Sequence, residues 1–143
     1  MFNAKHKTSI VSENRKHILS VKAIAGFDNN YFISENGVIT RTQREIVNSK
    51  GVKCRLPAKT MKPRCGKKYP HLFVDLHFNQ KRFTKYIHKV VAETFLPKPS
   101  EKHIYVRHID GNYSNNHISN LEWITNKELQ LNYQITRNKT NSI

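Results

Sequence analysis

Apolar and polar positions alternate most regularly along residues 69–78, with one face formed by Leu72, Val74, Leu76 and Phe78. A period of two is typical of a β-strand. Asn79-Gln80 predicts a turn, and residues 81–87 predict a second strand that completes a hairpin. Shorter strands are expected between Val21 and Arg41, where Asn36-Gly37 is a hairpin turn signal. Residues 43–64, interrupted by glycine and proline, predict a long loop or ribbon.

The period changes from two to that of a helix after the hairpin, at His88, Val91, Ala92 and Phe95. This helix must end by Leu96, because Pro97 follows and proline cannot continue a helix. Residues 104–107 then predict a short strand, residues 108–119 a polar loop rich in Asn, and residues 120–124 a second extended segment.

A second helix is predicted over about residues 125–134, and its start is well marked. Thr125 and Glu128 have the spacing of a capping box, and Ile124 and Leu129 that of a hydrophobic staple. The strands and the two helices together predict an α+β protein.

The composition of the 143 residues excludes several classes of protein. No apolar stretch approaches eighteen residues, so no membrane span is expected, and residues 1–20 lack the apolar core of a secretory signal. Cys54 and Cys65 are too few for a disulfide framework or a four-ligand zinc site, which favours a reduced, intracellular setting.

The net charge of +15 predicts a polyanionic partner, and nucleic acid is the usual one. Most of this charge lies between Arg41 and Val90, a segment that contains fourteen Lys or Arg residues and only two acidic residues. We expect phosphate contacts from the basic residues Lys62, Arg64, Lys67, Lys68, Lys81, Arg82 and Lys85. Aromatic residues are interleaved with them, and their periodicity favours core packing over base stacking: Tyr69, Phe73, Phe78, Phe83 and Tyr86.

One segment carries a specific motif: Y-V-R-H-I-D-G-N over residues 105–112, continued by N-N-H-I-S-N-L-E-W-I-T over residues 115–125. The order of strand, loop, strand and helix resembles the ββα-metal core, or His-Me finger, of HNH endonucleases. The similarity is greatest to the HNH enzymes of bacteriophages, including free-standing homing endonucleases. It extends upstream to H-K-V-V-A-E-T-F-L at residues 88–96 and to short strands within residues 24–39, which are similar to a module that often precedes the core.

The resemblance implies an organisation and a chemistry. Residues 1–20 would form an N-terminal extension, 21–66 a basic strand-rich module, 67–134 the HNH core and 135–143 a tail. The implied enzyme is a metal-dependent endonuclease that nicks or cuts double-stranded DNA in the cytoplasm of a bacterial host. It would use one divalent ion, Mg²⁺ or Mn²⁺ before Zn²⁺, and no small-molecule cofactor; a protein partner is not predicted.

Phosphodiester hydrolysis needs an activated water, and a histidine can accept its proton near neutral pH. By resemblance, His108 is this base and Asn120 is the residue that orients its ring. His117 either contacts phosphate or is a solvated loop residue, and His88 either packs the helix or contacts phosphate. The loop residues Asn112, Asn115 and Asn116 are expected to bond to the backbone of their own loop.

The motif departs from the family at the two metal-ligand positions, which here are Arg107 and Leu129. Arginine cannot ligate a cation, although it can clamp a phosphate. The remaining candidate ligands are Asp110, for which an ordinary turn is favoured, and Asn126 and Asn132. Two hypotheses follow: an endonuclease with an altered ligand set, or a DNA-binding protein on an HNH scaffold that does not cleave.

Overall fold

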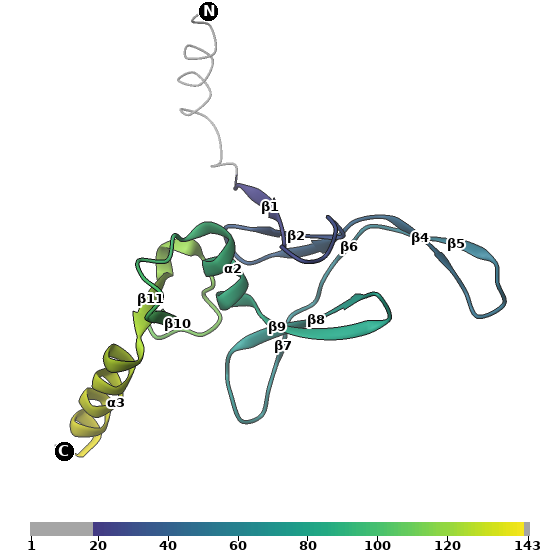
Figure 1. Cartoon of the computed structure of the whole chain (residues 1–143). Coiled ribbons are helices and arrows are strands. Elements are labelled where there is room, and N and C mark those ends of the chain that lie inside the picture. Colours follow the sequence, from purple (N-terminus) through teal and green to yellow (C-terminus); the bar gives the residue numbers. More distant parts are fainter. Residues whose placement is uncertain (1–18, 142–143) are drawn as a thin grey trace, which may run out of the picture.

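The computed structural model describes residues 19–141, so all but the end of the expected extension at 1–20 lies outside the described residues. Figure 1 shows a strand-rich mixed α/β chain with two described helices, in agreement with the predicted α+β class. The strands are β1 Val21–Ala23, β2 Tyr31–Ser34, β3 Ile39–Arg41, β4 Arg44–Val47, β5 Lys53–Leu56, β6 Lys59–Thr60, β7 Arg64–Cys65, β8 Leu72–Phe78, β9 Lys81–Tyr86, β10 His103–His108 and β11 Leu121–Thr125. The helices are α2 Ile87–Phe95, α3 Asn126–Asn141 and the short 3₁₀ helix η1 Ile118–Asn120.

The first sheet has the order β1-β2-β3-β6 and is antiparallel throughout. The predicted hairpin at Asn36-Gly37 joins β2 to β3, with Ile33 opposite Ile39. Gly37 has a φ of +84°, and an added Cβ would lie 2.8 Å from Ile87 and 3.0 Å from Asn116. Glycine is therefore required here both by the backbone conformation and by the close approach of two later segments.

Two further antiparallel units are present, one inserted between β3 and β6 of the first sheet and one after it. The strands β4 and β5 form a two-stranded ribbon that reaches away from the rest of the chain in Figure 1. The other unit has the order β7-β8-β9, and its predicted turn contains Asn79 and Gln80 with φ values of 50° and 61°. Two successive positive φ values are typical of the hairpin turn that matches the strand twist.

A single buried cluster joins the strand-rich half to the C-terminal half. It contains Ile24, Phe27, Tyr31, Ile33, Ile39, Val74, Leu76, Ile87, Val90, Val91 and Leu121. The Tyr31 hydroxyl also bridges β2 and β8, because it donates to the His77 carbonyl at 3.1 Å and accepts from the His77 amide at 3.0 Å. The segments on either side of residue 66 therefore stabilise each other through shared apolar burial.

The predicted capping box is present at the start of α3. The Thr125 amide donates to the Glu128 carboxylate at 2.7 Å, and the Glu128 amide donates to the Thr125 hydroxyl at 3.2 Å. Trp123, expected to be structural, donates its indole N–H to the carbonyl of Leu96 at 3.1 Å and so ties β11 to the end of α2. The helix α3 continues to Asn141, beyond the end predicted near residue 134.

The predicted core packing of the interleaved aromatic residues is correct for some and wrong for others. Phe78 packs against the core and meets the Phe27 ring edge to face. Tyr69 is 56% exposed and Tyr86 is 40% exposed. Tyr86 lies opposite Phe73 on the face of the β8–β9 hairpin that points away from the core residues Val74 and Leu76, and this explains its exposure.

Neither described helix is long and apolar enough to cross a membrane.

Candidate active site

His108 is the last residue of β10, where it lies opposite Leu121 of β11. The residue is only 6% exposed, and its Nε2 lies 2.8 Å from the amide oxygen of Asn116. Because an amide oxygen only accepts, this contact places the imidazole proton on Nε2 and leaves Nδ1 as the basic nitrogen. His108 Nδ1 is buried and has no hydrogen-bond partner among residues 19–141.

Asn120 does not take the orienting role that the resemblance implied. Its side-chain oxygen accepts from the Asp110 amide at 3.0 Å, and its NH₂ donates to the Asp110 carboxylate and the Asn115 carbonyl, each at 2.8 Å. The reason is its register: the Asn120 carbonyl accepts from the Ile109 amide, so its side chain meets the loop that follows His108. Asn120 closes this loop, and Asn116 orients the ring.

Asp110 has the turn role that was favoured for it. Its carboxylate accepts from the Asn112 amide at 2.7 Å and from the side chain of Asn115 at 3.0 Å, besides its bond to Asn120. These bonds, that from Asn115 first, hold the pKa of Asp110 below its usual value. The side chain of Asn112 bonds to the loop backbone as predicted, since it accepts from the Ser114 amide at 3.0 Å. The side chains of Asn115 and Asn116 bond instead to the Asp110 carboxylate and to the His108 ring.

Three histidine rings gather at this end of β10. The ring centroids of His71 and His88 are 4.8 Å apart, those of His88 and His108 5.0 Å, and those of His71 and His108 5.7 Å. Burial, followed by the neighbouring His71 and His108, lowers the pKa of His88 to about 3. Burial and His108 also lower the pKa of His71. Crowding and desolvation therefore favour neutral rings at His71 and His88.

The sequence identified His88 as a candidate site residue, but it did not identify His71. His88 belongs to the quoted motif, and its Nδ1, like that of His108, is buried without a hydrogen-bond partner in the described part of the chain. His71 was not singled out as a site residue. Its one signal is its position on the polar face of the alternating strand, which does not reveal that β8 passes close to His108.

A cavity of about 320 Å³ opens beside His108. Its lining includes His71 immediately before β8, Arg107 from β10 and Tyr113 from the loop, together with Leu129 and Asn132 from α3. Arg107 bonds to the Glu122 carboxylate, with Nε and one terminal nitrogen each 2.6 Å from the same oxygen. This ion pair is partly exposed, with 40% of the Arg107 side chain and 41% of the Glu122 side chain accessible.

The residues of this cavity do not form a ready metal centre. Within residues 19–141, no three His, Cys, Asp or Glu side chains are arranged to hold a metal ion. Of the predicted ligands, Asp110 is bonded to loop donors, Asn126 is exposed on the first turn of α3, and Asn132 lines the cavity of His108. A divalent ion that uses two side chains at most would depend on water and substrate oxygens for its other ligands.

The residues expected to contact DNA fall into two groups. Five are exposed: Lys62, which precedes β7, and Lys67, Lys68, Lys81 and Arg82, which lie on or between the strands of the β7–β9 sheet. Besides Arg107 and His88 of the His108 site, three others have partners inside the protein. Arg64 pairs with Asp75, Lys85 lies over the Phe27 ring at 5.9 Å, and the His117 ring accepts from the Ser119 amide to cap η1.

Comparisons with known proteins connect this geometry to a family. The model of the HNH endonuclease family matches residues 85–131, which contain His88, His108, Asn116 and Asn120. Two HNH endonucleases of Acanthamoeba polyphaga mimivirus are similar in sequence. One is 48% identical over 50 residues, which are 35% of this chain and 13% of that protein. The other is 39% identical over 69 residues, 48% of this chain and 21% of that protein.

A solved structure, described as DNA binding and cleavage by the HNH homing endonuclease I-HmuI, shares the fold. The TM-score is 0.63 and the sequence identity 27%, over 83% of this chain and 59% of that one. The chain therefore spans 13% and 21% of the two mimivirus relatives and 59% of the I-HmuI chain, which is less than two thirds of each. The resemblance predicted from the motif is confirmed: residues 85–131 match the HNH endonuclease family, and the chain has the fold of an HNH homing endonuclease.

Proposed function

We propose that this chain is a DNA endonuclease in which His108 is the general base. The observation that carries the proposal is the state of the His108 ring. Asn116 occupies Nε2 at 2.8 Å, and the buried Nδ1 is left without a partner in the described chain. His108 lines a cavity that Arg107 also lines. A buried lone pair without a donor is unusual in proteins, and a reacting water would satisfy it.

The reaction that this arrangement supports is hydrolysis of a phosphodiester. His108 Nδ1 accepts a proton from water as the water oxygen attacks phosphorus, and the bond from phosphorus to the 3′ oxygen breaks. The 3′ oxygen leaves on the opposite side of phosphorus and takes a proton from solvent water. The His108 imidazolium releases its proton to solvent and returns to the neutral base. Arg107 faces the same cavity and is suited to neutralise the phosphate, because its planar guanidinium can bind two oxygens at once.

The positions where the family resemblance implies metal ligands are Arg107 and Leu129, and no group of three His, Cys, Asp or Glu side chains replaces them in residues 19–141. A requirement for Mg²⁺ or Mn²⁺ is still part of the proposal, as is action in the cytoplasm of a bacterial host. The substrate we propose is double-stranded DNA, on the basis of the exposed lysine and arginine side chains of the β7–β9 sheet.

One observation favours a second candidate, a DNA-binding protein that does not cleave. The Arg107 side chain, paired with Glu122, lies at the position where the family resemblance implies a metal ligand. A cation held there by a carboxylate disfavours a second, divalent cation through charge repulsion. The protein would then keep the HNH fold and bind DNA, but it would not cleave the DNA.

The experiment that separates the candidates measures nicking of supercoiled plasmid with EDTA, Mg²⁺ or Mn²⁺. The endonuclease predicts nicking by the wild type, reduced about 10²-fold or more by His108→Ala. His77→Ala is the matched control, since His77 is an exposed histidine on β8. Binding of the plasmid without nicking under every condition would contradict the endonuclease and favour the second candidate, and undiminished nicking by His108→Ala would show that His108 is not the base.

A further inference from the structure

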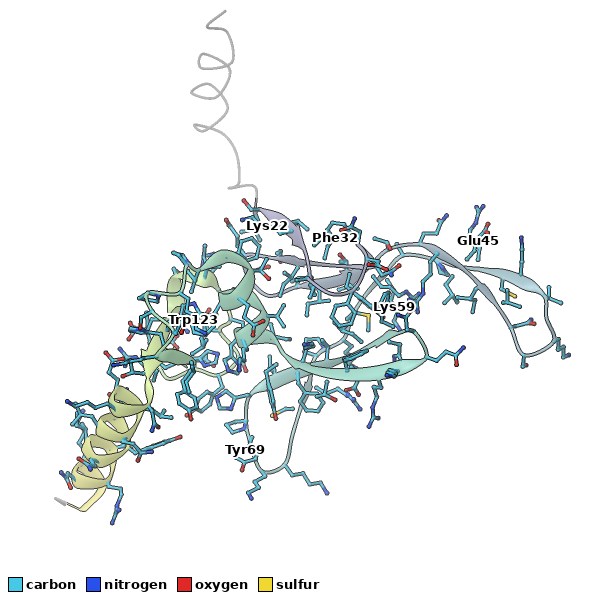
Figure 2. The ribbon with its side chains drawn as sticks, viewed as in Figure 1. Lys22, Phe32, Glu45, Lys59, Tyr69 and Trp123 are labelled. Atoms are coloured by element: carbon cyan, nitrogen blue, oxygen red, sulfur yellow. The ribbon has the colours of Figure 1, made fainter. Side chains whose placement is uncertain are left out.

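The distribution of tyrosines is uneven in a way that the proposed hydrolysis does not explain. The chain has six tyrosines, and only Tyr31 is in the core. The other five are between 39% and 59% exposed, and four of them line one cavity of about 340 Å³: Tyr69, Tyr86, Tyr105 and Tyr133. They come from the β7–β8 connection, where Figure 2 labels Tyr69, from the end of β9, from β10 and from α3.

This tyrosine cavity adjoins the cavity of His108. The two share His71, Val106, Leu129 and Tyr133 in their linings, and the His88 ring, 5.0 Å from that of His108, lines the tyrosine cavity. The fifth exposed tyrosine, Tyr113, lines the His108 cavity, where its ring centroid is 4.5 Å from that of His71. A group held between the tyrosines would therefore lie next to a phosphate at His108.

The chemistry of the tyrosine cavity fits a nucleotide base. Its lining combines tyrosine and histidine rings with Lys89, and none of its described lining residues is acidic. The ammonium of Lys68 lies 5.4 Å from the centre of the Tyr69 ring and adds positive charge at its edge. Protein sites for single strands combine positive charge with aromatic rings in this way, and a cavity of this size is at the small end of ligand sites, suitable for one flat ring system.

We infer that the tyrosine cavity binds one nucleobase that has left the base stack, in the DNA strand whose phosphate lies at His108. This inference rests on the proposed function and specifies that the DNA substrate has an unstacked base next to the phosphate that is cleaved. A base can reach the cavity only if it is unstacked and unpaired. The unpairing is easiest where the base is already mismatched or lacks a partner. DNA with an unpaired base should therefore be the preferred ligand.

The test compares two short duplexes that differ at one position, in EDTA to prevent cleavage. Each contains a single 2-aminopurine, either paired with thymine or opposite an abasic site, and an end label reports binding by anisotropy. The duplex with the unpaired base should bind about tenfold more tightly, in line with one base stacked on aromatic side chains. Its 2-aminopurine emission should fall on binding, because stacking on tyrosine quenches it.

Variants identify the cavity as the source of the preference. Tyr133→Ala should remove the preference, whereas Tyr133→Phe keeps a ring and should retain it. Leu131→Ala is the matched control, since Leu131 is an equally exposed residue of α3 that does not line the tyrosine cavity. Tyr69→Ala repeats the test outside α3, and a thermal melt of each variant confirms that it is folded.

Several results would overturn the inference. Equal affinity for the two duplexes, together with normal nicking of plasmid, would refute the base site and leave the proposed nuclease in place. Loss of the preference in Leu131→Ala as well would show that it does not come from the tyrosine cavity. A wild-type dimer that Tyr133→Ala dissociates would assign the tyrosines to contact between copies. No binding to either duplex would refute the inference and the proposed function together.

Discussion

The basic strands of the first half and the loop that follows His108 are built in opposite ways. On the β7–β9 sheet, charge is carried by long, exposed side chains such as Lys67, Lys68 and Lys81. In the loop, short polar side chains bond to one another and to the backbone, and both Asn116 and Asn120 are buried. Under the proposed function, contacts to phosphate would be spread over many replaceable residues, whereas the chemistry would depend on a few fixed ones.

This difference predicts which side-chain substitutions the protein tolerates. An exposed lysine acts through long-range charge, so each one contributes a modest and roughly additive share of affinity. A buried amide in a hydrogen-bonded network acts through position, so its loss also leaves other buried polar groups without partners. Affinity and catalysis should therefore respond to different substitutions.

The largest expected effect is on affinity and comes from salt. With fourteen Lys or Arg residues between Arg41 and Val90, we expect the association constant for duplex DNA to fall steeply as salt rises. Each neutralised phosphate contributes about −0.9 to the slope of log K against log salt, so six contacts would weaken binding ~10³-fold between about 50 and 200 mM. A slope near zero, measured by titration at several salt concentrations, would show that phosphates are not the main contact.

The second effect is on the loop and concerns Asn116. Asn116→Leu removes the bond to His108 Nε2, so the ring is no longer held with Nδ1 as the base. We expect the nicking rate to fall about 10- to 100-fold, as for other residues that orient a functional histidine, while DNA affinity is unchanged. Asn138→Ala, an exposed asparagine on α3, is the control. Nicking at the wild-type rate in folded Asn116→Leu would remove Asn116 from the mechanism.

The third effect is on stability and concerns Gly37, whose position in the β2–β3 turn lies against Ile87 of α2 and Asn116 of the loop. In Gly37→Ala the new Cβ meets Ile87 at 2.8 Å and Asn116 at 3.0 Å, at a φ of +84°. Overpacking of this kind costs about 1–3 kcal/mol, in addition to the backbone strain. Gly51→Ala separates the two causes, because Gly51 has a φ of +77° and open space around its Cβ position. Equal losses of melting temperature in the two variants would mean that the contact with Asn116 is unimportant.

The smallest effect is on the pH dependence of stability and concerns His88. Its pKa is lowered from 6.5 to about 3, so between these values the unfolded chain binds a proton that the folded chain does not. Stability must therefore fall as pH decreases from 6.5 toward 3, and His71 acts in the same direction. The lowered pKa values of Asp110 and Glu128 act only below about pH 4.5. His88→Phe should flatten the acid limb above that pH, and an unaltered limb would contradict the account.

The elements with a strong local signal were predictable from the sequence. The alternation before Phe78, the prolines after Leu96 and the capping box at Thr125 each depend on neighbours in the chain, and the structure has the element that each predicted. The length of α3 was missed, because most of its residues after Leu131 are exposed and leave no apolar stripe to follow.

The parts of the site that were missed depend on tertiary contacts. The choice between Asn116 and Asn120 as the partner of His108 is made by the path of the loop, which the spacing of asparagines does not reveal. His71 approaches His108 only because β8 packs against α2 and the loop, and Tyr86 is exposed only because the other face of its hairpin meets the core. Sequence patterns predict which residues share one face of a strand or helix, but they do not predict which distant segment packs against that face.

The central claim, that catalysis lies at the His108 loop and affinity on the basic strands, is tested most directly by measuring two constants on one duplex. These are the dissociation constant in EDTA and the cleavage rate constant at saturating protein with metal. We predict that His108→Ala lowers the rate constant ~10²-fold or more and leaves the dissociation constant unchanged. The double variant Lys67→Gln/Lys68→Gln should do the reverse, weakening binding while saturated cleavage continues at the wild-type rate. A His108→Ala variant that cleaves as fast as the wild type, or variants in which both constants change together, would contradict the account.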